Sequence, residues 1–288
     1  MNSPSIYKIC SRCVMDVTDP EIVFDDKGVC NHCHTWGERA RLAVDETSAG
    51  RVALEVHAAA MRHDGRGKDY DCVIGVSGGV DSTYVAYVVK HDLGLRPLAV
   101  HLDNGWNSTL AVTNIQRTLD RLGIDLESEV LDWDEFRDLQ LAFLKASTPD
   151  SEIPTDHAIQ ATLMAAARRH RLRYVIGGSN IASEGVLPRS WSHGIRDWKY
   201  IRGIHDRFGS VPLRSFPHFN LLDFARFWVL ERRQRVDILN FLPYRREEAM
   251  RVIETELGWE YYGGKHYESV YTRFFQAYIL PRKFGFDK

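Results

Sequence analysis

Six consecutive residues carry the clearest chemical signal in this chain: Ser77-Gly78-Gly79-Val80-Asp81-Ser82. An apolar run, 71–76, precedes them and helix-forming residues follow from Thr83 to Lys90, so a strand, a glycine-rich turn and a helix start come in succession. Such a turn directs backbone N–H groups at one place, where the helix dipole adds partial positive charge. The hexapeptide therefore predicts a binding site for a phosphate group.

The spacing separates this turn from two commoner phosphate-binding motifs. A Walker-type P-loop requires a lysine after its second glycine, and none follows Gly79. The dinucleotide fingerprint requires Gly-x-Gly-x-x-Gly, which these glycines do not match. Ser77 and Ser82 offer hydroxyl donors, whereas Asp81 would repel a bare phosphate and is predicted to act through Mg²⁺, which takes oxygen ligands. The alternative is a sharp strand-to-helix turn in which Asp81 only caps the helix.

The cysteines are concentrated near the N-terminus, where two Cys-x2-Cys pairs are separated by sixteen residues. The four residues are Cys10, Cys13, Cys30 and Cys33. This spacing predicts one tetrahedral Zn²⁺ site, and because sulfur fills all four positions, the site is expected to be structural. Disulfides are the alternative, but they are typical of secreted chains. His32 and His34 flank the second pair and are expected to support it or to face solvent.

The composition bounds the class of protein. The chain has 288 residues, 44% of them hydrophobic and 26% charged, with a formal net charge of −2. That balance is ordinary for a globular protein and lacks the basic field of a general nucleic-acid binder. No apolar run reaches the roughly 18 residues of a membrane span, and the polar N-terminus lacks a signal-peptide core. We expect a cytoplasmic protein that binds neither membrane nor nucleic acid.

Strand and helix patterns alternate between residues 69 and 189, which predicts an α/β fold with a doubly wound parallel sheet. The expected strands are 71–76, 97–102, 127–131 and 173–176, and the expected helices are 108–122, 133–145 and 156–170. In such sheets, ligands bind at the carboxyl ends of the strands. The loops after Val76, Leu102 and Ile176 are therefore the predicted site.

Three further segments accompany this domain. Residues 1–36 contain the paired cysteines and form the expected metal-binding module. Residues 37–68 are expected to be a helical linker with a break at Ser48-Ala49-Gly50. Residues 190–288 are rich in aromatic side chains and are expected to be a helical region that contacts substrate or partner.

The loops at the predicted edge of the sheet are polar. Asp103-Asn104-Gly105 follows the second strand, Gly177 to Glu184 follows the last one, and Pro154-Thr155-Asp156-His157 opens a helix. Each has a local alternative, because Asp103 suits a turn and Asp156 suits an N-cap. These loops lie at the same predicted edge of the sheet as residues 77–82, the phosphate loop. That position favours a substrate pocket.

The loop from Ser77 to Ser82 resembles that of the ATP pyrophosphatase, or PP-loop, superfamily, whose sheet is of the adenine-nucleotide alpha-hydrolase-like type. Members cleave ATP between the α- and β-phosphates and transfer AMP to a substrate oxygen. The resemblance implies ATP and Mg²⁺ as cofactors, with Asp81 and Ser82 as catalytic residues. The expected nucleotide-binding set is Val76, Ser77, Gly78, Gly79, Val80, Asp81, Ser82, His101, Asp103 and Gly177.

A second polar stretch runs from Gly258 to Glu268 and is followed by Thr272-Arg273-Phe274. Its glycines, tyrosines and ionisable groups suit closure over a nucleotide. Lys265 could neutralise the leaving pyrophosphate, and Arg273 could bind a carboxylate or phosphate through two hydrogen bonds. The alternative is a solvated lysine and a surface arginine.

Over nearly its whole length, the chain resembles the N-acetyl sugar amidotransferase family of bacterial surface-polysaccharide biosynthesis. Besides the phosphate loop, the shared motifs are Cys10 to Asp16, Cys30 to Cys33, Pro154 to His157, Gly178 to Ile181, Tyr262 to Glu268 and Thr272 to Phe275. The resemblance implies conversion of an acetamido group on a nucleotide-activated sugar into an acetamidino group, for O-antigen lipopolysaccharide or flagellar glycans. The expected substrate-binding residues are Asp156, His157, Asn180, Glu184, His266 and Arg273, and Lys265 is the third expected catalytic residue.

The implied reaction needs ammonia. ATP would adenylate the amide oxygen and release pyrophosphate, ammonia would add to the resulting imidate, and AMP would leave. A glutaminase needs a reactive cysteine, but four cysteines are assigned to zinc and Cys72 lies in a strand as a small buried residue. The resemblance therefore implies partners that supply ammonia: a glutaminase and a cyclase-like barrel, similar to the two parts of imidazole-glycerol-phosphate synthase. Family members commonly continue with further helical sequence past the point of Lys288, which would add partner contacts.

Two other functions fit parts of the sequence. A tRNA thiolation-type PP-loop sulfurtransferase also combines an adenylating loop with zinc knuckles, but it usually needs further catalytic cysteines or an iron–sulfur cluster and a basic face. A nucleotide-binding module that regulates a complex without catalysis would need no polar pocket. The intact loop with Asp81 favours an enzyme.

Overall fold

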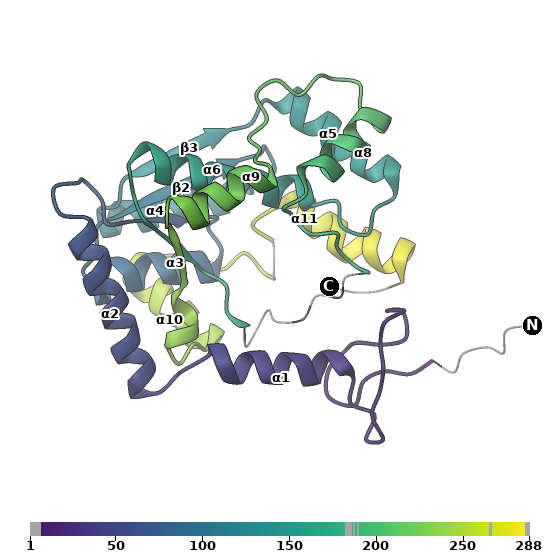
Figure 1. Ribbon diagram of the computed structural model, residues 1–288, viewed down its shortest axis with the longest axis horizontal. Coiled ribbons are helices and arrows are strands. Elements are labelled where there is room, and N and C mark those ends of the chain that lie inside the picture. The colour runs from purple at the N-terminus through teal and green to yellow at the C-terminus, as the bar shows by residue number, and fades with distance from the viewer. Residues whose placement is uncertain (1–6, 182–185, 187, 189, 265–266, 286–288) are drawn as a thin grey trace, which may run out of the picture.

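The computed structural model describes residues 7–181, 186, 188, 190–264 and 267–285. Its centre is a five-stranded sheet in the order β3-β2-β1-β4-β5, and all neighbouring strands are parallel (Figure 1). The strands are β1 Cys72–Gly75, β2 Pro97–Asp103, β3 Leu126–Val130, β4 Tyr174–Gly177 and β5 Gln234–Asp237. The predicted doubly wound parallel sheet is confirmed.

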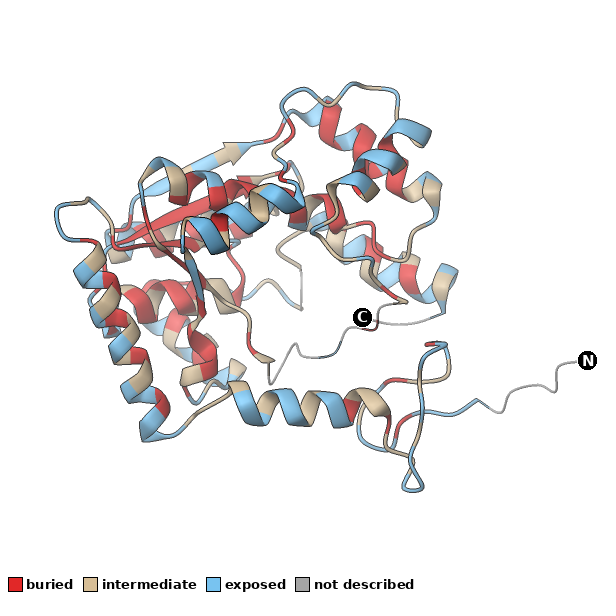
Figure 2. Cartoon of the chain, viewed as in Figure 1, coloured by how far each residue is buried: buried red, intermediate tan, exposed pale blue. Residues whose placement is uncertain are grey.

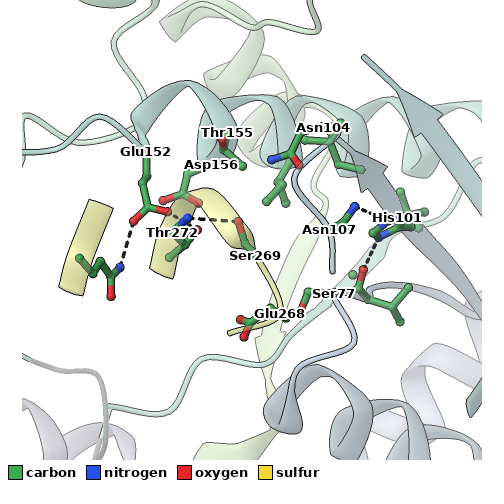
Figure 3. A pocket seen from close by; sticks show the side chains of 16 residues that line it. Ser77, His101, Asn104, Asn107, Glu152, Thr155, Asp156, Glu268, Ser269 and Thr272 are labelled. Atoms are coloured by element: carbon green, nitrogen blue, oxygen red, sulfur yellow. Dashed lines mark hydrogen bonds between the residues drawn. The ribbon is translucent and has the colours of Figure 1, made fainter. Parts of the chain in front are cut away.

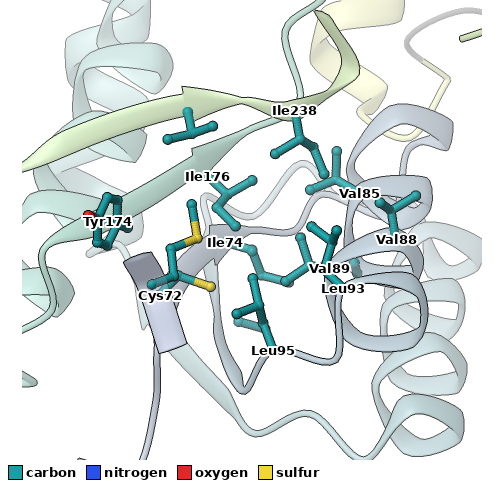
Figure 4. Packing of buried hydrophobic residues seen from close by; sticks show 14 of the residues in the cluster. Cys72, Ile74, Val85, Val88, Val89, Leu93, Leu95, Tyr174, Ile176 and Ile238 are labelled. Atoms are coloured by element: carbon teal, nitrogen blue, oxygen red, sulfur yellow. The ribbon is translucent and has the colours of Figure 1, made fainter. Parts of the chain in front are cut away.

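Alternation of side chains along the strands builds a core on each face of the sheet. Cys72 and Ile74 of β1 pack against helices on one face (Figure 4), whereas Val73 packs on the other face. The first face is covered by α2 Ser48–Asp64, α3 Val80–Tyr87 and α4 Thr109–Leu122. The second is covered by α6 Ile153–Arg169 and by α9 Leu221–Ala225 with its continuation η2 Arg226–Leu230.

The remaining elements lie around these two layers. They are α1 Asn31–Ala43, η1 Val88–Asp92, α5 Trp133–Ala146, α8 Trp198–Phe208, η3 Ile238–Phe241, α10 Arg246–Leu257, α11 Val270–Phe274 and η4 Phe275–Phe284. Buried residues concentrate in the sheet and on the helix faces turned toward it, as Figure 2 shows. Among the described residues, no helix has the length and apolar character needed to cross a membrane.

The four expected strands are each found within one residue of their predicted ends. Helix α6 begins three residues earlier than expected, because Pro154 lies in its first turn, where the missing N–H of proline costs no hydrogen bond. Strand β5 is an addition in the region expected to be helical. Only Val236 of its four residues is buried, so the strand lacks the apolar alternation that reveals strands in a sequence.

The expected helix break at Ser48-Ala49-Gly50 is wrong, because these residues begin α2. The Thr47 side chain caps this helix by accepting a hydrogen bond from the Ala49 N–H at 3.2 Å. Gly50 is required by packing rather than by a break, since a Cβ atom there would lie 1.8 Å from the Asp45 carbonyl oxygen. The chain leaves α1 at Val44 instead.

Candidate functional site

The phosphate loop lies where the direction of the sheet connections changes. From β1 the chain builds β2 and β3 on one side and then returns to β4 on the other side. Ligands of parallel α/β sheets bind in the crevice that this change creates at the carboxyl ends of the strands. Residues 77–82 follow β1 at this place, and α3 begins at Val80 with Gly79 as its N-cap.

Side-chain hydroxyls hold the loop in shape. The Ser77 and Ser82 hydroxyl oxygens lie 3.1 Å apart, and the Gly79 N–H donates to Ser77 Oγ at 3.3 Å. The Ser82 hydroxyl also donates to the Gly79 carbonyl at 3.2 Å. Gly78 has a φ of +77°, and a Cβ atom there would lie 2.5 Å from the Ala111 carbonyl oxygen. Only glycine fits that position.

Asp81 lies in the first turn of α3, where its charge complements the helix dipole. Its carboxylate accepts a hydrogen bond from the hydroxyl of Tyr244, a residue that follows η3 in the chain. Asp81 is not the cap of this helix, because Gly79 is the N-cap and no side chain caps α3 by a hydrogen bond. The place of Asp81 in the first turn suits a ligand of a cation brought by a nucleotide. Neither Asp81 nor Ser82 lines the cavity described next.

A cavity of about 570 Å³ opens beside Ser77 at the carboxyl ends of β1 and β2 (Figure 3). The polar residues around it come from the phosphate loop, β2 and its following loop, the start of α6, and α11 with its flanks. They are Ser77, His101, Asn104, Asn107, Glu152, Thr155, Asp156, Glu268, Ser269, Thr272 and Gln276. The cavity can therefore bind a ligand with many hydroxyl or amide groups.

His101 is fixed in orientation by both ring nitrogens. Its Nδ1 lies 2.9 Å from the Val76 carbonyl, which can only accept, so Nδ1 carries the proton. Its Nε2 lies 3.2 Å from Asn107 Nδ2 and can accept from that amide. His101 thereby connects β2 to the start of the phosphate loop at the cavity wall.

Glu152 reaches the cavity from the N-terminal end of α6 and is held by two residues of the C-terminal helix. The Thr272 hydroxyl donates to one carboxylate oxygen, and Gln276 Nε2 donates to the other at 2.9 Å. Glu152 is not among the site residues predicted from the sequence, although it lies two residues before the Pro154-Thr155-Asp156-His157 motif. A single glutamate there has no pattern of its own that would mark it.

The C-terminal stretch meets the phosphate loop and the loop after β2. Trp259 Nε1 donates to the Gly78 carbonyl at 2.9 Å, and buried Asn114 makes two hydrogen bonds with the backbone of Glu260. Farther along, the Ser108 N–H donates to the Glu268 carbonyl at 2.8 Å. These contacts bring Glu268 and Ser269 to the cavity.

Of the expected site residues, Val76, Ser77, His101 and Asp156 line the cavity. Other expected residues are engaged elsewhere. Asp103 accepts from the Gly105 N–H in a turn, Asn180 donates to the Leu239 carbonyl, and exposed Arg273 stacks on the Tyr267 ring at 4.1 Å.

Gly177 ends β4, where a Cβ atom would lie 2.0 Å from Asp237 Oδ1. That oxygen ends a flexible side chain, so packing alone does not require glycine here, and the role of Gly177 in nucleotide binding stays a prediction. Lys265, His266 and Glu184 lie outside the described residues, and their roles stay predictions.

His157 is fully buried and is not among the residues that line the cavity. Its Nδ1 donates to the Ile195 carbonyl at 2.6 Å, and its Nε2 accepts from the Phe219 N–H at 3.2 Å. The ring also stacks on Phe219 with 4.3 Å between centroids. Burial lowers the pKa of His157 to about 4, so it is neutral at pH 7 and tethers the segment between β4 and α9.

The four N-terminal cysteines converge on one point. Their sulfurs all lie within 4.8 Å of one another, with 3.8 Å between Cys10 and Cys33 and 3.7 Å between Cys13 and Cys30. Sulfurs at about 2.3 Å from a tetrahedral Zn²⁺ are about 3.8 Å apart, whereas a disulfide requires about 2.05 Å. The arrangement fits a tetrahedral metal ion and excludes disulfides among these residues.

The surroundings of Cys10 suit a thiolate ligand. Burial alone would raise the pKa of Cys10, but N–H donors of Arg12, Cys13 and Cys30 lower it to about 6. Burial raises the pKa of Cys30 and of Cys33. The flanking histidines do not join the cluster, since His32 and His34 bind Asp19 and Asp25. The cysteines pack against Trp191, Tyr271 and Phe275.

No protein-family model matches the sequence, and no curated protein matches it. Solved structures give low similarities. One is a predicted subunit of tRNA methyltransferase from Methanocaldococcus jannaschii, with a TM-score of 0.35 and 14% identity over 64% of this chain and 75% of that chain. Another is the NH3-dependent NAD synthetase from Campylobacter jejuni, with a TM-score of 0.36 and 17% identity over 72% of this chain and 84% of that chain. Neither similarity assigns a function.

Proposed function

We propose that this protein is an ATP-dependent enzyme that cleaves ATP to AMP and pyrophosphate and adenylates an acceptor held in the cavity. The observation that carries this proposal is the position of Ser77. It belongs to the phosphate loop and also lines the cavity, so a nucleotide on the loop would present its phosphates to a ligand in the cavity. Loop N–H groups and the α3 dipole would stabilise phosphate charge.

The acceptor in this proposal is the acetamido group of a nucleotide-activated sugar. The amide oxygen attacks the α-phosphorus, the bond to the β-phosphate breaks, and pyrophosphate leaves. Ammonia then adds to the imidate carbon, the C–O bond breaks, and AMP departs. The product is an amidine. The enzyme would contribute mainly positioning and electrostatic stabilisation. Asn104, Asn107 and Thr155 offer the hydrogen-bonding groups that sugar hydroxyls and an amide need.

The two proposed metal ions have separate roles. Mg²⁺ would neutralise phosphate charge, with Asp81 as the protein ligand on the loop. Zn²⁺ on the four cysteines would be structural, because the donor set leaves no open position. Lys265 is proposed to neutralise the leaving pyrophosphate.

The cysteines bear on the source of nitrogen and on the alternative of sulfur transfer. Cys72 is fully buried in β1, and burial raises the pKa of its thiol, so it is a poor nucleophile. The other four cysteines form the cluster that could hold a metal ion. Neither a glutaminase cysteine nor a sulfur-carrying cysteine is therefore at hand, which favours ammonia delivered by a glutaminase and a cyclase-like barrel partner over tRNA thiolation.

Acceptor dependence tests this proposal. The purified chain, with MgATP and ammonium, is incubated with a panel of acetamido nucleotide sugars and, separately, with tRNA. We expect AMP to form with one of the sugars and the sugar product to lose about one mass unit, as O is replaced by NH. Modification of tRNA, or AMP formation with no member of the sugar panel, would contradict it.

A further inference from the structure

Tyr262 and Glu268 lie on the anion-binding side of the phosphate loop. A Cβ atom built on Gly79 would lie 3.5 Å from the Tyr262 hydroxyl oxygen and 3.6 Å from Glu268 Oε1. Gly79 is the N-cap of α3, so these two side chains are beside the positive end of that helix. Nucleotide phosphate would have to occupy the same space in the proposed function.

The Tyr262 hydroxyl links the start of α3 to the carboxylate. The Val80 N–H and Glu268 are both close enough to shift its pKa, the N–H downward and the carboxylate upward. Val80 is the first residue of α3, whose N–H has no partner within the helix. Burial, followed by the Glu268 charge, raises the pKa of Tyr262, so the hydroxyl keeps the proton that it donates.

We propose that Glu268, acting through the Tyr262 hydroxyl, is an internal occupant of the phosphate loop that competes with the phosphates of the nucleotide. A phosphate oxygen must replace the Tyr262 oxygen at the Val80 N–H, and its charge is repelled by Glu268 at close range. Occupancy of the loop by this pair and by phosphate is therefore mutually exclusive. This inference rests on the proposed nucleotide site and adds a residue pair that sets its affinity.

Glu268 also gives the loop a connection to the cavity. It is one of the cavity-lining residues, and its backbone carbonyl accepts from the Ser108 N–H. An acceptor that donates a hydrogen bond to Glu268 would draw the carboxylate away from Tyr262. Acceptor and nucleotide should then each raise the affinity for the other, because binding free energies are coupled reciprocally.

The test is calorimetric titration of the full chain with MgATP and with inorganic pyrophosphate. Glu268→Gln keeps the size of the side chain and removes its charge, and Tyr262→Phe keeps the ring and removes the hydroxyl. Glu260→Gln is the matched control, since it removes an exposed carboxylate of the same stretch that pairs with Arg117. We expect each of the first two variants to lower both dissociation constants at least about fivefold, the low end of typical coupling.

The outcomes separate the inference from the proposed nucleotide site. The double variant should gain little more than either single one, because the two residues act as one unit. Unchanged or weaker binding of both ligands by Glu268→Gln, relative to wild type and Glu260→Gln, would overturn the inference. Weaker binding of MgATP alone would also overturn it, because Glu268 would then be a ligand of the nucleotide's cation. If wild type binds neither ligand but the variants do, the inference stands. If none of the proteins binds, the proposed nucleotide site fails with it.

Discussion

At the residue scale, the phosphate loop depends on one position that only glycine can fill. Gly78 combines a positive φ with close approach to the Ala111 carbonyl. The Gly78 carbonyl oxygen also accepts a hydrogen bond from Trp259 Nε1. A side chain there would strain the backbone and push the loop away from α4. The loop is therefore fixed before any ligand arrives, which lowers the cost of ordering it on binding.

Gly78→Ala should cost more stability than Gly94→Ala and should weaken ATP binding at least roughly tenfold. Gly94 also has a positive φ, but nothing lies within 4 Å of its Cβ position, so it isolates the backbone strain of about 1–2 kcal/mol. Urea unfolding and nucleotide titration measure the two effects. Equal losses in both variants would show that the Ala111 contact does not constrain the loop.

At the element scale, α11 connects the cysteine cluster to the cavity. Tyr271 packs against the cysteines and Trp106, and its hydroxyl lies 2.7 Å from Ser151 Oγ. The next residue, Thr272, binds Glu152 at the cavity wall. The metal module should therefore hold one wall of the cavity in place without touching its ligand.

Loss of the metal should loosen that wall. Cys10→Ser should remove the bound zinc and lower the unfolding free energy by several kcal/mol, because structural zinc contributes folding energy. Cys72→Ala is the control, since it alters a buried cysteine outside the cluster. The Cys72→Ala variant should keep about one zinc ion per chain, as measured by elemental analysis. Full zinc content in Cys10→Ser would contradict the four-cysteine site.

His157 should make stability fall in acid. Its folded pKa is about 4, below the unfolded value of about 6.5, so only the unfolded chain takes up the proton between these values. Stability is therefore full above pH ~6.5 and should decline by up to about 3 kcal/mol as the pH falls toward 4. Urea unfolding across this range measures the decline. The slope should flatten in His157→Gln, and an unchanged slope would assign it to other groups.

At the scale of the whole molecule, the sequence predicted what local pattern encodes. Apolar runs located four strands, and the glycine-rich turn and the paired cysteines located the loop and the cysteine cluster. It did not predict contacts between distant segments, such as Glu152 with Thr272, which are 120 residues apart. It also assigned His157 to the substrate, whereas both ring nitrogens bind the backbone. A polar residue in a motif does not reveal which side of its helix will be buried.

The products of ATP most directly test the central claim, that the loop after β1 supports cleavage between the α- and β-phosphates. The full chain is incubated with MgATP, ammonium and the active acetamido nucleotide sugar, and phosphorus NMR follows the nucleotide. The account predicts equal amounts of AMP and pyrophosphate, both lost in Asp81→Ala while zinc stays bound. ADP and inorganic phosphate as the products would contradict it.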